Sequence, residues 1–138
     1  MAGEAQRWLS GLLRTGVSFR VPEIADYEQR RELLRSGRRR SVERMDELAA
    51  MIGYLPITTT VMRRAARLWA QARNEGRPTA SPESLDADVI LAAQALVLEE
   101  ESGEAVVVAT TNPNHLSRYV AAEDWRDIVP APTEDTEG

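Results

Sequence analysis

The run AVVVAT at residues 105–110 restricts the fold of this chain more than any other segment. Its residues are consecutive, apolar and mostly β-branched, which is typical of a parallel strand that is covered on both faces. A parallel strand joins its neighbours through crossover connections, and these usually contain helices. The run therefore predicts an α/β fold, with helices on both sides of a mostly parallel central sheet.

The rest of the sequence contains the helices and strands that such a fold needs. Apolar residues recur at helical spacing in residues 4–13, 23–36, 41–52, 61–76 and 84–100. Residues 17–21 and 54–58 have the pattern of strands, and residues 124–129 that of a last edge strand. We expect Ser41 to cap the third helix, and Thr59 or Thr60 to cap the fourth. Residues 1–129 should form one domain, and residues 130–138 a disordered acidic tail.

The composition excludes several classes of site and location. With no cysteine and a single histidine, the chain can form no disulfide, no thiolate metal site and no multi-histidine zinc site. No apolar run approaches the roughly 20 residues that span a bilayer, and the first residues lack the order of a signal peptide. We therefore expect a cytoplasmic protein that has no membrane partner.

Positive charge is concentrated in one segment, although the net charge of the chain is −5. All 17 basic residues are arginine, and Arg38, Arg39 and Arg40 are consecutive. Such arginines can hold the backbone phosphates of a nucleic acid without reading its sequence. They can equally form a solvated helix face and loop, and the sequence leaves both interpretations open.

Four polar residues fall near the carboxyl ends of the predicted strands, where α/β folds place their ligand sites. Glu28 is early in the second helix, Asp86 and Asp88 are in the first turns of the long helix, and Asn112 follows the strand at 105–110. Carboxylate and amide oxygens suit Mg²⁺ or Mn²⁺, which can activate water beside a phosphoryl group. Residues i and i+2 of a helix point about 200° apart, so the two aspartates should not be equivalent ligands.

Each of these residues also has an ordinary structural explanation. An aspartate in the first turn of a helix stabilises the helix dipole by about 0.3–1 kcal/mol. Glu28 can pair with Arg31 on its own helix, and Asn112 stands before a proline, as in many turns. We interpret His115 as a helix-start or packing residue instead of a catalytic base.

Three segments of the chain resemble the PIN-domain family, which includes the VapC toxins of toxin–antitoxin systems and related ribonucleases. Residues 21–33 (VPEIADYEQRREL) resemble the family's strand-to-helix stretch that carries a metal-site glutamate. Residues 88–96 (DVILAAQAL) are similar to its D-x-x-I/L-A-A-x-A helix, and residues 106–116 (VVVATTNPNHL) to its strand ending in T-x-N/D. The resemblance implies a three-layer PIN-like domain.

The resemblance also implies an activity, a metal-dependent endoribonuclease that hydrolyses single-stranded RNA by attack of water on the phosphodiester. Glu28, Asp88 and Asn112 would be catalytic. Glu28 and Asp88 would bind Mg²⁺ or Mn²⁺, with Asp86 as a weaker candidate, and Thr110 would donate a hydrogen bond nearby. An antitoxin protein and a second copy of the chain would be further partners.

The family's first strand, whose aspartate is a principal metal ligand, has no counterpart in this sequence. A late start position, a truncation or a degenerate family member would each account for its absence, and its loss would expose two strand edges. The alternative function is therefore a non-catalytic PIN domain that binds RNA or a protein. A DNA-binding regulator is a third hypothesis, but no helix-turn-helix pattern accompanies the three arginines.

Overall fold

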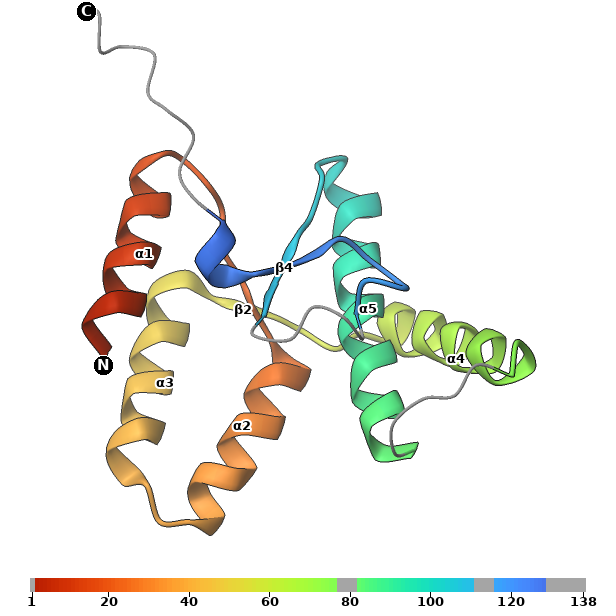
Figure 1. Ribbon diagram of the computed structural model, residues 1–138, viewed down its shortest axis with the longest axis horizontal. Coiled ribbons are helices and arrows are strands. Elements are labelled where there is room, and N and C mark those ends of the chain that lie inside the picture. The colour runs from red at the N-terminus through yellow and green to blue at the C-terminus, as the bar shows by residue number, and fades with distance from the viewer. Residues whose placement is uncertain (1, 77–81, 111–115, 129–138) are drawn as a thin grey trace, which may run out of the picture.

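The computed structural model describes residues 2–76, 82–110 and 116–128 (Figure 1). Helices form most of the described chain: α1 (Ala2–Arg14), α2 (Glu23–Arg35), α3 (Arg39–Ile52), α4 (Thr59–Asn74) and α5 (Pro82–Ser102). They alternate with short strands: β1 (Val21–Pro22), β2 (Tyr54–Leu55), β3 (Val108–Thr110) and β4 (Ala122–Asp124). A single 3₁₀ turn, η1 (Trp125–Asp127), follows β4. This alternation confirms the predicted α/β class.

The described strands pair in parallel, as predicted, but they do not form one sheet. β1 pairs with β2, with Val21 opposite Tyr54, and β3 pairs with β4, with Thr110 opposite Asp124. The result is two separate two-stranded sheets in place of the expected single central sheet. The strands are only two or three residues long, so each offers few backbone groups to a further neighbour.

Prolines explain where the first two strands end. Proline has no N–H group to donate to a neighbouring strand. Pro22 is the last residue of β1, and α2 begins directly after it. Pro56 follows β2 in the same way, so residues 56–58 leave the sheet and lead into α4.

The predicted edge strand at residues 124–129 is wrong. β4 instead ends at Asp124, and the chain turns into η1. The indole of Trp125 makes an edge-to-face contact with Trp8 of α1, with ring centroids 5.4 Å apart. Nε1 of Trp8 donates a hydrogen bond to the carbonyl of Ile128 at 2.8 Å. These contacts hold the segment against α1, and an extended strand would lose them.

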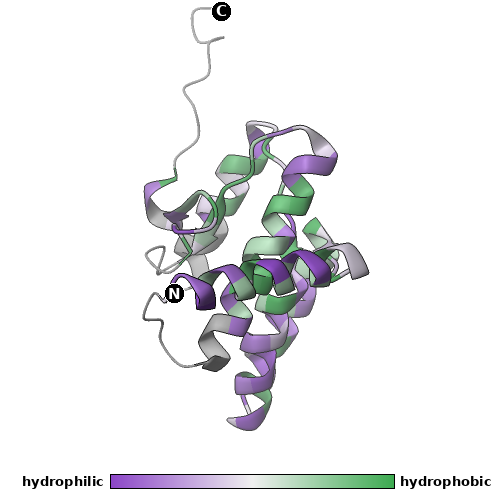
Figure 2. Ribbon diagram, turned by 90° about the vertical axis from the view of Figure 1, so that its right-hand side faces the viewer, coloured by the Kyte–Doolittle hydropathy of each residue, from purple (hydrophilic) through white to green (hydrophobic). Residues whose placement is uncertain are grey.

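Helices α2 and α3 form a hairpin, whose connecting tip is mostly hydrophilic (Figure 2). Gly37 adopts a φ of 74°, which side chains other than glycine rarely tolerate. The N–H of Arg38 then donates to the carbonyl of Leu33 at 2.9 Å. These backbone bonds start α3 at Arg39, so Ser41 lies inside the helix and the prediction that it is the cap is wrong.

The cap of α4 lies one residue earlier than the sequence predicted. Oγ1 of Thr58 accepts a hydrogen bond from the N–H of Val61 at 3.2 Å. Thr59 and Thr60 are therefore in the first turn of the helix. The chemistry of the cap was predicted correctly and its position was not.

The main core lies where α4 crosses α5 (Figure 1). Small and β-branched residues fill it, which allows the two helix backbones to approach closely: Val61, Ala65, Ala72, Val89, Ala93 and Val97. Ala93 is completely buried. This packing fixes the position of α5, the helix that carries two of the predicted metal ligands.

Candidate functional site

One amide side chain in the core, that of Gln94 on α5, links two segments that are distant in the sequence. It is 0% exposed. Its Nε2 donates to the carbonyl of Leu55 in β2 at 2.7 Å, and its Oε1 accepts from the N–H of Ile24 in α2 at 3.5 Å. Buried polar groups are stable only when they are hydrogen-bonded. Gln94 therefore sets the position of α5 against both α2 and β2.

The Gln94 contact also determines which residues of α2 and α5 lie together. Glu28 follows Ile24 by one helical turn, about 6 Å, and Asp88 precedes Gln94 by about 9 Å along α5. Helices α2 and α5 run in roughly opposite directions (Figure 1). Moving from Ile24 to Glu28 along α2 therefore leads in the same direction as moving from Gln94 back to Asp88 along α5. The charge of Asp88 accordingly acts on Glu28, as the smallest of the three causes that shift the pKa of Glu28.

The pKa of Glu28 is raised above its ordinary value by its surroundings. Burial is the largest cause, the charge of Arg31 acts in the opposite direction, and the charge of Asp88 raises the pKa further. The net shift is upward, so the charge of Arg31 does not outweigh burial and the repulsion from Asp88. A cation placed between the two carboxylates would reverse this balance, because an opposite charge favours the ionised form.

The two aspartates of α5 differ in their surroundings. Asp88 is half-buried, whereas Asp86 is exposed. This difference follows from their two-residue separation on a helix. Of the two aspartates, Asp88 is the one whose charge acts on Glu28, and Asp86 lies nearer to solvent.

Thr110 lies at the carboxyl end of β3, where the sequence placed it. The strand register sets it opposite Asp124, the last residue of β4, and both side chains are half-buried. Asp124 is a candidate that sequence reasoning missed, because it was expected to begin a strand and not to end one. Asn112, the other candidate beyond β3, lies outside the described residues, as do His115 and residues 130–138.

A charged network beside the site was not predicted either. The guanidinium of Arg30 donates from Nε to Oδ1 of Asp26 at 2.8 Å, and from Nη2 to Asp46 of α3 at 2.8 Å. The hydroxyl of Tyr54 donates to Asp26 at 2.9 Å. Arg30 thereby lowers the pKa of Asp26. The network links α2, α3 and β2, so the side chains of Asp26 and Arg30 have a structural role.

Arg38, Arg39 and Arg40 are exposed at the tip of the α2–α3 hairpin. Glu28 is seven residues before Arg35, the end of α2, which corresponds to about 10 Å along the helix. The arginines are thus beyond hydrogen-bonding reach of the carboxylate pair. They are at a distance where an extended ligand could contact both.

The residues at this site fit a divalent cation of the Mg²⁺ type. Mg²⁺ usually keeps several waters and binds proteins through one or two carboxylates, and Glu28 and Asp88 supply two. Over residues 2–76, 82–110 and 116–128, no group of three or more His, Cys, Asp or Glu side chains could hold a metal ion. Two carboxylates can hold a largely hydrated ion of this type.

Comparison of the chain with protein-family models gave no match. Comparisons with curated proteins and with solved structures gave no match either. The resemblance to the PIN family therefore rests on the three sequence segments. Among the helices of the described chain, none is long and apolar enough to cross a membrane.

Proposed function

We propose that this chain is a metal-dependent endoribonuclease of PIN type that cleaves single-stranded RNA. The observation that carries the proposal is the raised pKa of Glu28 on α2, to which burial contributes most and the charge of Asp88 on α5 contributes further, although the two helices are far apart in the sequence. Like charges in a half-buried position are unfavourable unless a cation or a proton compensates them. The α/β class and the parallel strands support the proposal, and the three-layer PIN-like architecture is part of it.

Glu28 and Asp88 would hold Mg²⁺ or Mn²⁺, and the ion would supply an activated water and stabilise charge on the phosphodiester. Glu28 must lose its proton to bind a cation, and its raised pKa makes that step sensitive to pH. Thr110 and Asn112 would orient the scissile group at the carboxyl end of β3. Asp86 would assist as a weaker ligand.

Arg38, Arg39 and Arg40 would bind phosphates of the RNA on one side of the cleavage point. Exposed arginines make charge-assisted hydrogen bonds to phosphate without selecting a base. An antitoxin protein that covers the acidic site and a homodimer are further parts of the proposal. Cytoplasmic location and the absence of a membrane partner complete it.

A non-catalytic binding module is the second candidate function. The observation that favours it is the number of ligands, since no group of three or more His, Cys, Asp or Glu side chains that could hold a metal ion is found among the described residues. In this version the chain would bind RNA or a protein partner and would not hydrolyse it.

Cleavage of a labelled single-stranded RNA in Mn²⁺, with EDTA as a control, tests the proposal. We expect Asp88→Asn and Glu28→Gln to lower the rate at least 100-fold, the size expected when an electrostatic group at a reacting centre is lost. Asp86→Asn is the matched control on the same helix and should have a much smaller effect. Absence of cleavage by the unmodified chain, with RNA binding retained, would establish the second candidate instead.

A further inference from the structure

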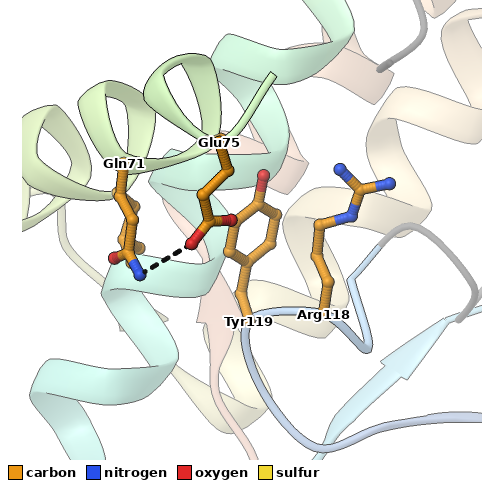
Figure 3. A pocket seen from close by; sticks show the side chains of 6 residues that line it. Gln71, Glu75, Arg118 and Tyr119 are labelled. Atoms are coloured by element: carbon orange, nitrogen blue, oxygen red, sulfur yellow. Dashed lines mark hydrogen bonds between the residues drawn. The ribbon is translucent and has the colours of Figure 1, made fainter. Parts of the chain in front are cut away.

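A cavity of about 350 Å³ lies between the last turns of α4 and the turn at residues 116–120 (Figure 3). Six residues line it: Leu68, Gln71, Ala72, Glu75, Arg118 and Tyr119. Its volume is at the lower end of the range of roughly 300–1,000 Å³ that holds small ligands. Neither Glu28 nor Asp88 contributes to its lining.

The polar groups of the cavity are held in defined positions. Nε2 of Gln71 donates to Oε2 of Glu75 at 3.3 Å, so the amide and the carboxylate form one polar wall (Figure 3). The guanidinium of Arg118 lies 5.9 Å from the ring centroid of Tyr119. Leu68 and Ala72 provide an apolar surface between these groups.

The hydroxyl of Tyr119, whose side chain lines the cavity, is an unsatisfied polar group of the fold. Its oxygen is buried, and it has no hydrogen-bond partner in the described parts of the chain. A buried polar group in this state destabilises a fold by about 1–3 kcal/mol. Because the oxygen is closed off from solvent, a molecule in the cavity would contact the ring of Tyr119 and not its hydroxyl.

The lining matches the parts of a nucleotide. A guanidinium such as that of Arg118 binds phosphate through parallel N–H donors. The amide of a glutamine reads the edge of a base, most often adenine, and a carboxylate accepts from an exocyclic amino group. The apolar surface of Leu68 and Ala72 suits the flat face of a base.

We propose that this cavity binds one nucleotide of an RNA strand, with its phosphate on Arg118 and its base edge toward Gln71. The choice of RNA as the source of the nucleotide rests on the proposed function. The cavity would then anchor the RNA substrate away from the cleavage point. Tyr119 packs against the same core cluster that contains Val89, the residue next to Asp88. The two sites therefore share α5 and α4 as a common framework.

Titration of the chain with the four ribonucleoside monophosphates in EDTA, followed by calorimetry, tests the proposal without any cleavage. We expect saturable binding with a dissociation constant below about 1 mM for at least one of them. Arg118→Met should weaken it at least tenfold, and Gln71→Ala should change the order of preference among the bases. Arg63→Met, an exposed arginine of α4 outside the cavity, is the matched control and should bind like the unmodified chain.

No saturable binding up to about 10 mM, or equal binding by Arg118→Met, would overturn the proposal. If nucleotides bind but RNA is not cleaved, the nuclease proposal fails and the nucleotide site stands. If RNA is cleaved but nucleotides do not bind, the nucleotide site fails and the nuclease proposal stands.

Discussion

Replacing Gln94 by methionine tests the hydrogen bonds that hold α5 against α2 and β2. Methionine has nearly the volume of glutamine, so the change removes the amide with little alteration of the packing. The carbonyl of Leu55 loses a donor at 2.7 Å, and the N–H of Ile24 loses a weaker acceptor at 3.5 Å. A buried group left without its partner costs about 1–3 kcal/mol, and the longer bond contributes less. We expect the free energy of unfolding to fall by about 2 kcal/mol.

The expected change in melting temperature follows from the size of the chain. An unfolding entropy of about 2.1 cal/mol/K per residue, over 138 residues, gives roughly 0.29 kcal/mol/K. A loss of about 2 kcal/mol therefore lowers Tm by roughly 7 °C. Urea denaturation followed by circular dichroism measures the free energy, and a thermal scan measures Tm. Gln29→Met on the exposed side of α2 is the matched control and should change Tm little.

A change of less than about 0.5 kcal/mol in Gln94→Met would refute this reasoning, since effects of that size are typical of surface substitutions. It would mean that apolar packing between α4 and α5 alone positions α5. The convergence of Glu28 and Asp88 would then need another explanation.

Three further changes test other contacts. Thr58→Ala should lower the free energy of unfolding, measured by urea denaturation, by about 1 kcal/mol, because it removes the α4 cap. Thr59→Ala is the control and should have little effect. Equal effects of the two changes would contradict the assignment of Thr58 as the cap. The pKa of Asp26 is lowered by Arg30, so its stabilising contribution is present above its ordinary value of 3.8 and is lost as the pH falls through the lower, folded-state value. Asp26→Asn should therefore reduce stability at pH 7 and flatten its fall in acid, and an unchanged acid profile would argue against the ion pair. The pKa of Glu28 is raised, so the folded state disfavours its charged form above that pKa. Glu28→Gln should therefore stabilise the chain at pH 7 in EDTA, and it should abolish the rise in Tm that we expect Mn²⁺ to produce in the unmodified chain. A lower Tm of Glu28→Gln in EDTA would contradict this.

The sequence predicted the helices well because their signals are local. Apolar spacing located all five, and glycine marked the end of α3, where Gly53 adopts a φ of 86°. The first three strands were predicted near their observed places but too long, and the last was misplaced, because each strand needs hydrogen bonds from a partner distant in the sequence. Pro22 and Pro56 were visible as limits, and the turn of the chain at Trp125 was not, since it depends on contact with Trp8.

The candidate site was predictable in part for the same reason. Glu28 and Asp88 were selected from the sequence, and in the structure the charge of Asp88 acts on Glu28. The role of Gln94 could not be deduced, because a single amide in an apolar helix is explained only by Ile24 and Leu55, which are 70 and 39 residues away. Asp124 was missed because its importance depends on where β4 ends.

The hydrogen bond between Trp8 and Ile128 has a consequence for folding during synthesis. It joins residues 120 positions apart, and bonds of such long range are slow to form because a long loop must close first. A ribosome adds about 5–20 residues per second, so α1 leaves the exit tunnel well before its partner residue has been made. The α2–α3 hairpin can form in that interval, before the bond between Trp8 and Ile128 is available. Chaperones that act on the growing chain would thus encounter α1 without this C-terminal contact.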